Sequence, residues 1–328
     1  MEPLLSIRQL RVNIETPGPH PPIRAVDGVD LGIVQGQIHA LVGESGCGKT
    51  TLALSVGRLL PPRARIVSGR IFFEGADLTS LPEDKLRTFR GGRIAYIFQD
   101  PMSALNPVMS VEEQLMEALH LHERGRAQAT RRRAMEFLSR VKIPAPERVI
   151  RQYPHQLSGG LRQRVMIAMA LAGSASLVIA DEPTTALDVT TQAEILDLLK
   201  SLTTLGMALL LITHDLMGVA AASDRVSVMY AGRIVEEIPT KEFVQNASHP
   251  YAQALLSCCP RVGVGRQRLR AIPGSVPDLR FTPSGCPFHP RCPEAIASCS
   301  QKEPTLQLIG PAHKVSCFMR DPTKWGTS

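Results

Sequence analysis

The sequence predicts an α/β fold, in which helices pack on a sheet, followed by a small C-terminal extension rich in Pro and Cys. Two short apolar runs, residues 177–180 and 208–212, flank a stretch of helical period at 190–205. Apolar runs of this length are typical of buried strands. A glycine-rich turn at 43–50 also separates an apolar run from a helical stretch. Strands and helices in alternation predict a parallel α/β core.

The other elements follow in order along the chain. Alternating apolar and polar residues predict a strand at 4–14, and a Pro- and Gly-rich segment at 16–22 ends it. Further strands are expected at 25–33, 37–42, 71–73 and 94–98, and helices from the glycine-rich turn to about Leu60 and across 110–142. The run at 37–42 is almost wholly apolar, which favours a central place in the sheet. The helical period at 110–142 predicts an inserted helical subdomain.

Composition excludes several classes of protein. The chain has 328 residues, 44% apolar and 20% charged, which is an ordinary globular balance and enough to bury a core. The longest uncharged run in its apolar middle, 165–180, is shorter than the roughly 20 residues that cross a bilayer, so we expect no transmembrane segment. The residues before Arg8 do not have the pattern of a secretory signal. With no sign of secretion, seven cysteines favour a reducing cytoplasm and a metal site over disulfides.

A net charge of +7 suits anionic ligands or an anionic surface. The basic residues of the predicted insertion lack interleaved aromatics, so we expect a solvated face or one near lipid headgroups, and no nucleic acid. These basic residues are Arg124, Arg126, Arg131, Arg132 and Arg133.

The glycine-rich turn fits the pattern G-x4-G-K-[ST] of a phosphate-binding loop, between a predicted strand and a predicted helix. Its glycines let backbone N–H groups turn toward phosphate oxygens, and the helix N-terminus adds partial positive charge. Lys49 is expected to reach the outer phosphates, and the Thr50 hydroxyl to bind Mg²⁺. The predicted nucleotide-binding residues are Gly43, Glu44, Ser45, Gly46, Cys47, Gly48, Lys49, Thr50 and Thr51.

Cys47 lies inside this loop. A thiol at a helix N-terminus is expected to have a lowered pKa. The alternative, which we prefer, is that position 47 accepts a small side chain without chemistry of its own.

A second set of polar residues follows the apolar run at 177–180. Asp181 is expected to hold Mg²⁺ through water, and Glu182 to polarise the attacking water as general base. A strand that ends in Asp-Glu is a modest signal alone, and it becomes strong beside a phosphate loop.

The segment Leu-Ser-Gly-Gly-Leu-Arg-Gln-Arg at 157–164 resembles the signature motif of ABC transporter ATPases. Gln99 matches the Q-loop of that family, Ala-Leu-Asp at 186–188 matches its D-loop, and His214 matches its switch histidine. These motifs stand in the family's order across residues 4–239. The residue types support this resemblance, because Ser158 opens a helical stretch and offers a hydroxyl and backbone N–H groups to an anion.

The resemblance implies a mixed sheet, a helical subdomain at about 100–172 and a nucleotide-binding domain at 1–248. It also implies a head-to-tail dimer with two ATPs, each between one phosphate loop and the signature of the partner. Ser158, Gly159 and Gly160 then act on the partner's ATP, with Asp188 in the D-loop, while His214 contacts the γ-phosphate. Thr50, Gln99 and Asp181 hold Mg²⁺. Many relatives stack an aromatic residue on adenine where this chain has Ile14.

Four cysteines stand close together near the C-terminus, at Cys286, Cys292, Cys299 and Cys317. Their spacing, C-x5-C-x6-C-x17-C, lacks the C-x2-C pairs of a zinc ribbon. Loosely spaced thiolates are equally compatible with an iron–sulfur cluster, so spacing alone leaves zinc and iron–sulfur open. His289 and His313 lie near enough in sequence to be alternative ligands, although surface positions are the simpler interpretation.

Residues 249–328 resemble the C-terminal extension of ATP-binding subunits from oligopeptide and dipeptide importers, on the segments His-Pro-Tyr at 249–251, Ile-Pro-Gly at 272–274 and Pro-Arg-Cys at 290–292. In some of those subunits the four cysteines carry a [4Fe–4S] cluster. The resemblance implies peptide import and a place on the cytoplasmic face of the inner membrane as a peripheral protein. Its implied partners are a second, homologous ATPase subunit, two transmembrane permease subunits and, indirectly, an extracytoplasmic binding protein. Import of nickel or another small solute, or a soluble ATPase uncoupled from transport, are the alternatives.

Overall fold

The computed structural model describes residues 2–122, 127–204, 206–259 and 271–320, and these form two compact units. Unit 1 comprises residues 1–34, 38–79 and 213–328, and unit 2 comprises 35–37 and 80–212. Arg124 and Arg126 of the basic stretch lie outside the described residues. Within the described ranges, no helix combines the length and the apolar character that a membrane span requires.

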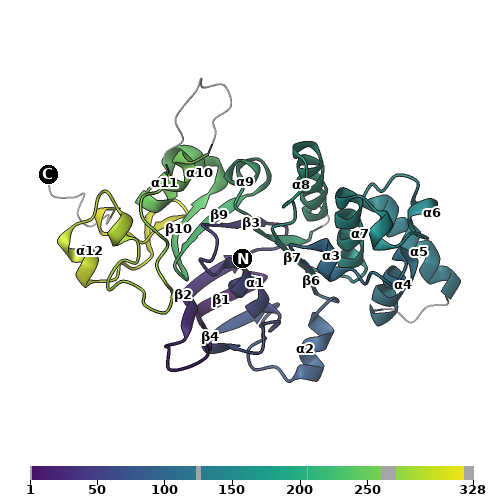
Figure 1. Ribbon diagram of the computed structural model, residues 1–328, viewed down its shortest axis with the longest axis horizontal. Coiled ribbons are helices and arrows are strands. Elements are labelled where there is room, and N and C mark those ends of the chain that lie inside the picture. Colours follow the sequence, from purple (N-terminus) through teal and green to yellow (C-terminus); the bar gives the residue numbers. More distant parts are fainter. Residues whose placement is uncertain (1, 123–126, 205, 260–270, 321–328) are drawn as a thin grey trace. The chain divides into compact units, whose positions relative to one another are not determined.

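Unit 1 begins with an antiparallel sheet of strand order β2-β1-β4-β5 (Figure 1). Its strands are β1 (Leu5–Ile14), β2 (Ile23–Ile33), β4 (Ala64–Phe73) and β5 (Ala76–Asp77). The strand predicted at 71–73 is longer in the structure, because β4 pairs with β1 along its whole length, from Leu5 opposite Phe73 to Ile14 opposite Ala64. Alternation alone predicted only the parallel strands, and this antiparallel layer agrees with the mixed sheet that the resemblance implies.

A second group of strands in unit 1 follows the order β11-β12-β10-β9-β3. These are β3 (Ile38–Val42), β9 (Arg225–Tyr230), β10 (Arg233–Pro239), β11 (Gln307–Gly310) and β12 (His313–Val315). β3 pairs parallel with β9, and the other pairs are antiparallel, so this part of the sheet is mixed. All five residues of β3 are buried, as its apolar run predicts.

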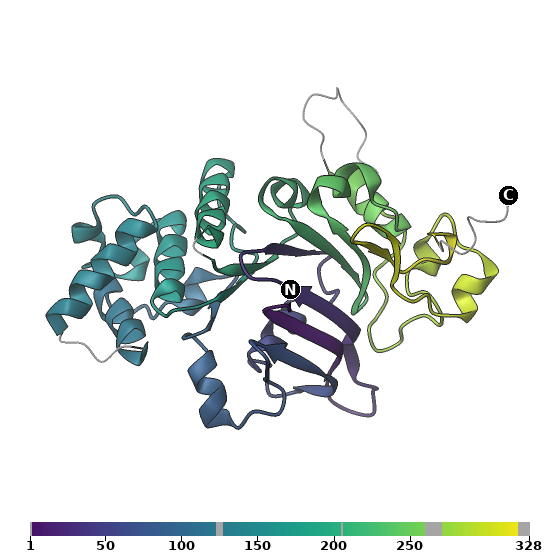
Figure 2. The ribbon, with the colours of Figure 1, turned by 180° about the vertical axis from the view of Figure 1, so that it is seen from behind.

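The helices of unit 1 connect or cover these strands (Figure 2). They are α1 (Lys49–Val56), α9 (Leu216–Ala222), α10 (Thr240–Asn246), α11 (Pro250–Ser257), α12 (Ala297–Gln301) and the short 3₁₀ turns η2 (His289–Arg291) and η3 (Phe318–Arg320). α1 ends at Val56 with Gly57 as its C-cap, earlier than the expected Leu60. Aromatic residues of β9, α11 and the C-terminal segment, among them Tyr230, Tyr251 and Phe288, form one buried cluster. The C-terminal residues therefore share a core with the phosphate loop's unit.

Unit 2 contains three parallel strands in the order β8-β7-β6. They are β6 (Ile94–Ile97), β7 (Leu177–Asp181) and β8 (Ala208–Ile212). Its helices are α2 (Glu83–Phe89), α3 (Pro101–Ala104), α4 (Val111–His122), α5 (Ala127–Arg140), α6 (Pro146–Val149), the 3₁₀ turn η1 (Pro154–Gln156), α7 (Gly159–Leu171) and α8 (Val189–Thr203). The helical insertion consists of several helices, and α4, α5 and α7 pack on one another (Figure 1).

Candidate nucleotide site

The phosphate loop lies between β3 and α1, and two of its glycines are sterically required. At Gly43, with φ +155°, a Cβ would lie 2.2 Å from the Met229 carbonyl oxygen. At Gly48, with φ +107°, a Cβ would lie 2.0 Å from the Ala25 carbonyl oxygen. No side chain fits at such distances, and positive φ also favours glycine. The glycines of the motif therefore let the loop pass close to β2 and β9.

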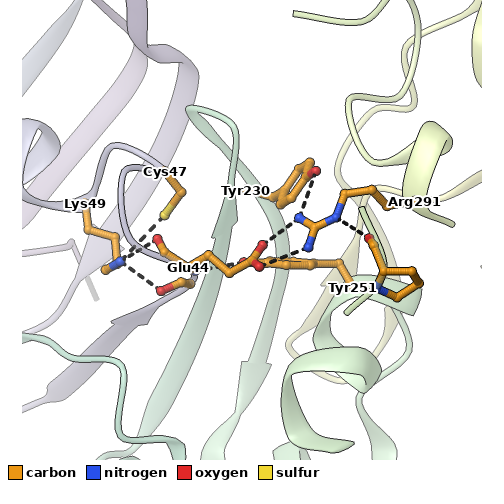
Figure 3. A network of polar contacts seen from close by, with 8 residues as sticks. Glu44, Cys47, Lys49, Tyr230, Tyr251 and Arg291 are labelled. Atoms are coloured by element: carbon orange, nitrogen blue, oxygen red, sulfur yellow. Dashed lines mark hydrogen bonds and ion pairs between the residues drawn. The ribbon is translucent and has the colours of Figure 1, made fainter. Parts of the chain in front are cut away.

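Lys49 is the first residue of α1, and its side chain is directed back into the loop (Figure 3). Its Nζ donates hydrogen bonds to the carbonyl oxygens of Gly43 at 2.8 Å and Glu44 at 3.0 Å. The residue is 6% exposed. A buried ammonium group inside a glycine-rich loop is suited to bind a polyanion.

Cys47 does not have the lowered pKa that its place before a helix suggests. Its side chain is fully buried, and burial raises the pKa of the thiol more than Lys49 lowers it. The alternative interpretation, a small side chain without chemistry, agrees with this surrounding.

Three further predicted nucleotide residues stand in unit 1. Thr50 is exposed in the first turn of α1, Ile14 is the last residue of β1, and His214 is exposed at the junction between β8 and α9. The neighbouring Asp215 caps α9, because its Oδ1 accepts from the N–H groups of Met217 and Gly218 at 3.1 and 3.0 Å. This cap fixes the turn that carries His214.

The predicted general base, Glu182, lies in unit 2 directly after β7. Its Oε2 accepts hydrogen bonds from Gln99 Nε2 at 3.1 Å and from Thr185 Oγ1 at 2.9 Å. Its backbone has φ +46°, and its N–H donates to the Ile212 carbonyl at 2.8 Å. A non-glycine residue in this conformation is a local strain of the kind that concentrates at functional sites.

The contact with Glu182 also orients Gln99. Because the amide nitrogen of Gln99 faces the carboxylate, its carbonyl oxygen is the atom that can serve a cation. Asp181, half-buried at the end of β7, adds a carboxylate in the same unit. Carboxylate and amide oxygens are ligands that Mg²⁺ prefers, so the chemistry of Gln99 and Asp181 in unit 2 suits that ion, as the hydroxyl of Thr50 does in unit 1.

The signature residues form the N-terminus of α7. Ser158 is the N-cap, and its Oγ accepts from the N–H of Leu161 at 3.4 Å. Ser158 and Gly159 are exposed. A Cβ at Gly160 would lie 2.8 Å from Thr191 Cγ2, so the third residue of the motif packs tightly against α8.

Asp188 of the predicted D-loop is the N-cap of α8. Its two carboxylate oxygens accept from the N–H of Thr191 at 3.0 Å and from Thr191 Oγ1 at 2.7 Å. These hydrogen bonds lower the pKa of Asp188. Thr191 therefore contacts both predicted motifs, the signature at Gly160 and the D-loop at Asp188.

The structure brings the predicted residues together in two groups. Unit 1 holds the phosphate loop, Ile14 and His214. Unit 2 holds Gln99, Asp181, Glu182, the signature and Asp188, with Gln99 and Glu182 in contact.

One contact of the phosphate loop was missed by the sequence reasoning. Glu44 forms a paired ion pair with Arg291, at 2.7 and 3.0 Å, and its N–H donates to Tyr251 Oη at 2.8 Å (Figure 3). Arg291 lies 247 residues further along the chain, so no local sequence pattern predicts this ion pair. The sequence offers one indication of a role for Arg291, which is its place beside Cys292 in the Pro-Arg-Cys segment at 290–292.

The four C-terminal cysteines line one pocket of unit 1, together with His249, Phe288 and His289. Burial raises the pKa of Cys286 to about 11, and the neighbouring thiols add to the effect. The same cause raises the pKa of Cys292 and Cys317. The four cysteines that the sequence groups by spacing thus line the same pocket.

In the ranges that the structure describes, no group of three or more His, Cys, Asp or Glu side chains has an arrangement that could hold a metal ion. The thiols therefore share a pocket without forming a ligand set for zinc or iron. His313 donates or accepts at Glu236 Oε1, 2.7 Å away, and the His289 ring contacts the Cys286 carbonyl. Both histidines have partners other than a metal.

Comparisons with known proteins agree with these motifs. A family model described as "ABC transporter" matches residues 26–185, and one described as "Oligopeptide/dipeptide transporter, C-terminal region" matches 235–299. The dipeptide transport ATP-binding protein DppD of Bacillus subtilis is 44% identical over 98% of this chain and 96% of its own length. DppD of Haemophilus influenzae is 46% identical over 96% of this chain and 94% of its own.

One similar solved structure is a dimeric post-hydrolysis state of the ATP-binding cassette MJ0796, bound to ADP and Pi. It has a TM-score of 0.65 and 29% sequence identity to this chain, and the match covers 72% of this chain and 99% of that one. This likeness confirms the predicted mixed α/β fold. Together with the phosphate loop, these matches show that the chain belongs to the ATP-hydrolysing subunits of ABC transporters, in the branch that carries the oligopeptide/dipeptide C-terminal region.

Proposed function

We propose that this chain is the energy-coupling subunit of an importer for di- or oligopeptides. The cargo rests on the relatives, which are named as dipeptide transport proteins. In this role the chain works at the cytoplasmic face of the inner membrane as a peripheral protein, beside two permease subunits and a second, homologous ATPase. Peptides reach the permeases from an extracytoplasmic binding protein. The nucleotide-binding domain spans 1–248, with its helical subdomain at about 100–172, and the extension spans 249–328.

The observation that carries the proposal is the exposure of the signature. Ser158 and Gly159 lie open at the N-terminus of α7, while the phosphate loop surrounds a buried Lys49. A chain with one phosphate-binding loop around its own buried lysine and a second motif at an exposed helix N-terminus is suited to a head-to-tail dimer, in which each exposed motif closes on the partner's ATP. ATP binding then brings the subunits together, and hydrolysis separates them.

In the hydrolytic step, Lys49 and the loop N–H groups bind the phosphates, and Ile14 gives adenine an apolar contact. Thr50, Gln99 and Asp181 would hold Mg²⁺, which would neutralise negative charge on the phosphates. Glu182 accepts a proton from the attacking water, and Gln99 and Thr185 hold its carboxylate in position. His214 contacts the γ-phosphate from the turn that Asp215 caps.

The test of this assignment is Glu182→Gln. The variant should bind ATP with unchanged affinity, hydrolyse it at least about 100-fold more slowly and accumulate as a closed dimer, because the amide cannot accept the proton. ATP turnover and size-exclusion chromatography with ATP measure the two effects. Near-normal hydrolysis by this variant would refute the base assignment.

A second experiment tests the transport role. Purification of the tagged chain from its native host in mild detergent should recover two polytopic membrane proteins and a homologous ATPase. Recovery of ribosomes or DNA without membrane proteins would favour the soluble alternative. Recovery with a binding protein for nickel or another solute would replace the peptide cargo.

We also propose that Cys286, Cys292, Cys299 and Cys317 are the ligands of a [4Fe–4S] cluster with a structural role. The convergence of four thiols on one pocket supports this, and their side chains must move closer together to bind a cluster. When bound, such a cluster joins four separate chain segments through thiolate bonds. Cys292→Ser should remove the brown colour and the iron of protein purified without oxygen, whereas Cys259→Ser should retain both. Unchanged iron in Cys292→Ser, or zinc in the wild type, contradicts the proposal.

A further inference from the structure

Arg291 is a buried cation between the cysteine pocket and the phosphate loop. It ends the 3₁₀ turn η2, next to Cys292, and its side chain is only 5% exposed. Four hydrogen bonds fix the guanidinium: two to the Glu44 carboxylate, one to Tyr230 Oη at 3.3 Å and one to the Pro273 carbonyl at 2.9 Å (Figure 3). The orientation of this side chain is thus determined by three segments of unit 1.

Glu44, the second residue of the phosphate loop, is held at both its backbone and its side chain. Arg291 binds the carboxylate, and Tyr251 Oη accepts the N–H at 2.8 Å. Burial raises the pKa of Tyr251, so its hydroxyl remains protonated and neutral. The Glu44 carbonyl in turn accepts from Lys49 Nζ. Arg291, Glu44 and Lys49 are therefore linked through consecutive bonds.

A carboxylate in a loop that binds ATP is unfavourable by itself. It carries the same sign as the triphosphate, and like charges a few ångströms apart repel strongly where water is partly excluded. The paired bonds from Arg291 neutralise Glu44 and keep its carboxylate turned toward the C-terminal segment. The same bonds limit the conformations of the loop backbone from which Lys49 extends.

We propose that Arg291 is a positioning residue for ATP binding, which acts by neutralising and orienting Glu44 of the phosphate loop. The cysteine-rich segment is then a working part of the nucleotide site as well as an appended unit. The proposal concerns ATP binding by this chain, and it does not depend on the cargo, on the partner subunits or on a cluster in the cysteine pocket.

The test compares Arg291→Gln in the wild-type and Glu44→Gln backgrounds of the full chain. ATP affinity is measured by displacement of a fluorescent ATP analogue, with thermal unfolding followed with and without ATP. We expect Arg291→Gln to raise the Kd for ATP about tenfold, a typical size for coupling between neighbouring sites. In the Glu44→Gln background the same change should raise the Kd less than about threefold, because no carboxylate remains to repel the phosphates.

Arg280→Gln is the matched control, since Arg280 pairs with Asp278 in the same unit at an exposed site. It should leave the Kd unchanged. If Arg291→Gln binds ATP as the wild type does, the proposal is wrong. Equal losses of ATP affinity in both backgrounds overturn it as well, because they indicate a purely structural role. A lower melting temperature, with an unchanged increase of that temperature on adding ATP, has the same meaning.

Arg291→Lys keeps the test decisive if Arg291→Gln does not fold. Its ammonium retains the charge but cannot form the paired bonds. We expect a Kd about threefold above that of the wild type and no such increase in the Glu44→Gln background. An unchanged Kd, or an increase of equal size in both backgrounds, contradicts the proposal.

Discussion

The N-termini of α1 and α7 both carry glycine-rich motifs expected to bind phosphate, yet their surroundings differ. At α1 the backbone of β2 and β9 approaches Gly48 and Gly43 so closely that no side chain fits. At α7 the nearest atom to a Cβ on Gly159 is 3.5 Å away, at an ordinary contact distance, and Ser158 is exposed. The first motif is completed by its own unit. The second leaves its polar groups accessible to another molecule.

Gly48→Ala should have the largest effect. Its Cβ meets the Ala25 carbonyl, and φ +107° is strained for alanine, so the loop must move. A displacement of about 1 Å in a binding site can lower activity by about 100-fold, and we expect a comparable loss of ATP affinity, measured by fluorescence titration. Gly46→Ala is the control, because Gly46 also has a positive φ, +79°, but outside its two chain neighbours no atom lies within 4 Å of its Cβ. Equal affinities for the two variants would show that close backbone contact does not shape the loop.

Ser158→Ala tests the exposed motif. We expect ATP binding by the isolated chain to be unchanged, because in the proposed dimer the serine serves the ATP of the partner. Turnover should fall about 100-fold, as when one donor to a developing charge is removed. Loss of the N-cap also lowers the free energy of unfolding by about 1 kcal/mol. Weaker binding by the isolated chain would contradict the division of roles between the two motifs.

The sequence alone predicts those elements of the fold that depend on a local pattern of residues. β3, β7 and β8 are short apolar runs with buried residues, and all three were predicted within one residue. The hairpin of β9 and β10 was missed, because its two-residue turn uses Ala231 at φ +47° before Gly232, and alanine is not a turn signal. The pairing of Arg291 with Glu44 depends on tertiary packing and has no local pattern. Spacing grouped the cysteines but did not fix the geometry of their side chains.

Gly160→Ala tests the close packing between the signature residues of α7 and Thr191 of α8. The new Cβ would approach Thr191 Cγ2 to 2.8 Å, so overpacking should lower the free energy of unfolding by about 1–3 kcal/mol. Thr191→Ser removes that methyl group and retains the hydroxyl that donates to Asp188. The double variant should therefore recover most of the stability in denaturant titrations. Failure to recover it would mean that the glycine is required for its backbone instead.

His249→Asn has the smallest expected effect. It concerns the surroundings of the phosphate loop at α1, which Tyr251 contacts, and leaves the motif at α7 untouched. His249 is the N-cap of α11, its Nδ1 accepts the N–H of Tyr251, and burial lowers its pKa to about 3. Because the unfolded chain takes up this proton near pH 6.5 and the folded chain does not, stability falls as the pH drops from about 6.5 toward 3.

The pKa difference contributes about 2 kcal/mol of destabilisation at pH 5 relative to pH 7. Asparagine keeps an acceptor at the N-cap without titrating, so the variant should lose about that much less stability over this interval in denaturant titrations. Since Tyr251 binds the phosphate loop, ATP affinity should also be less acid-sensitive in the variant. A parallel pH dependence in both proteins would assign the acid sensitivity to other groups, such as the buried His39, whose pKa burial lowers to about 4.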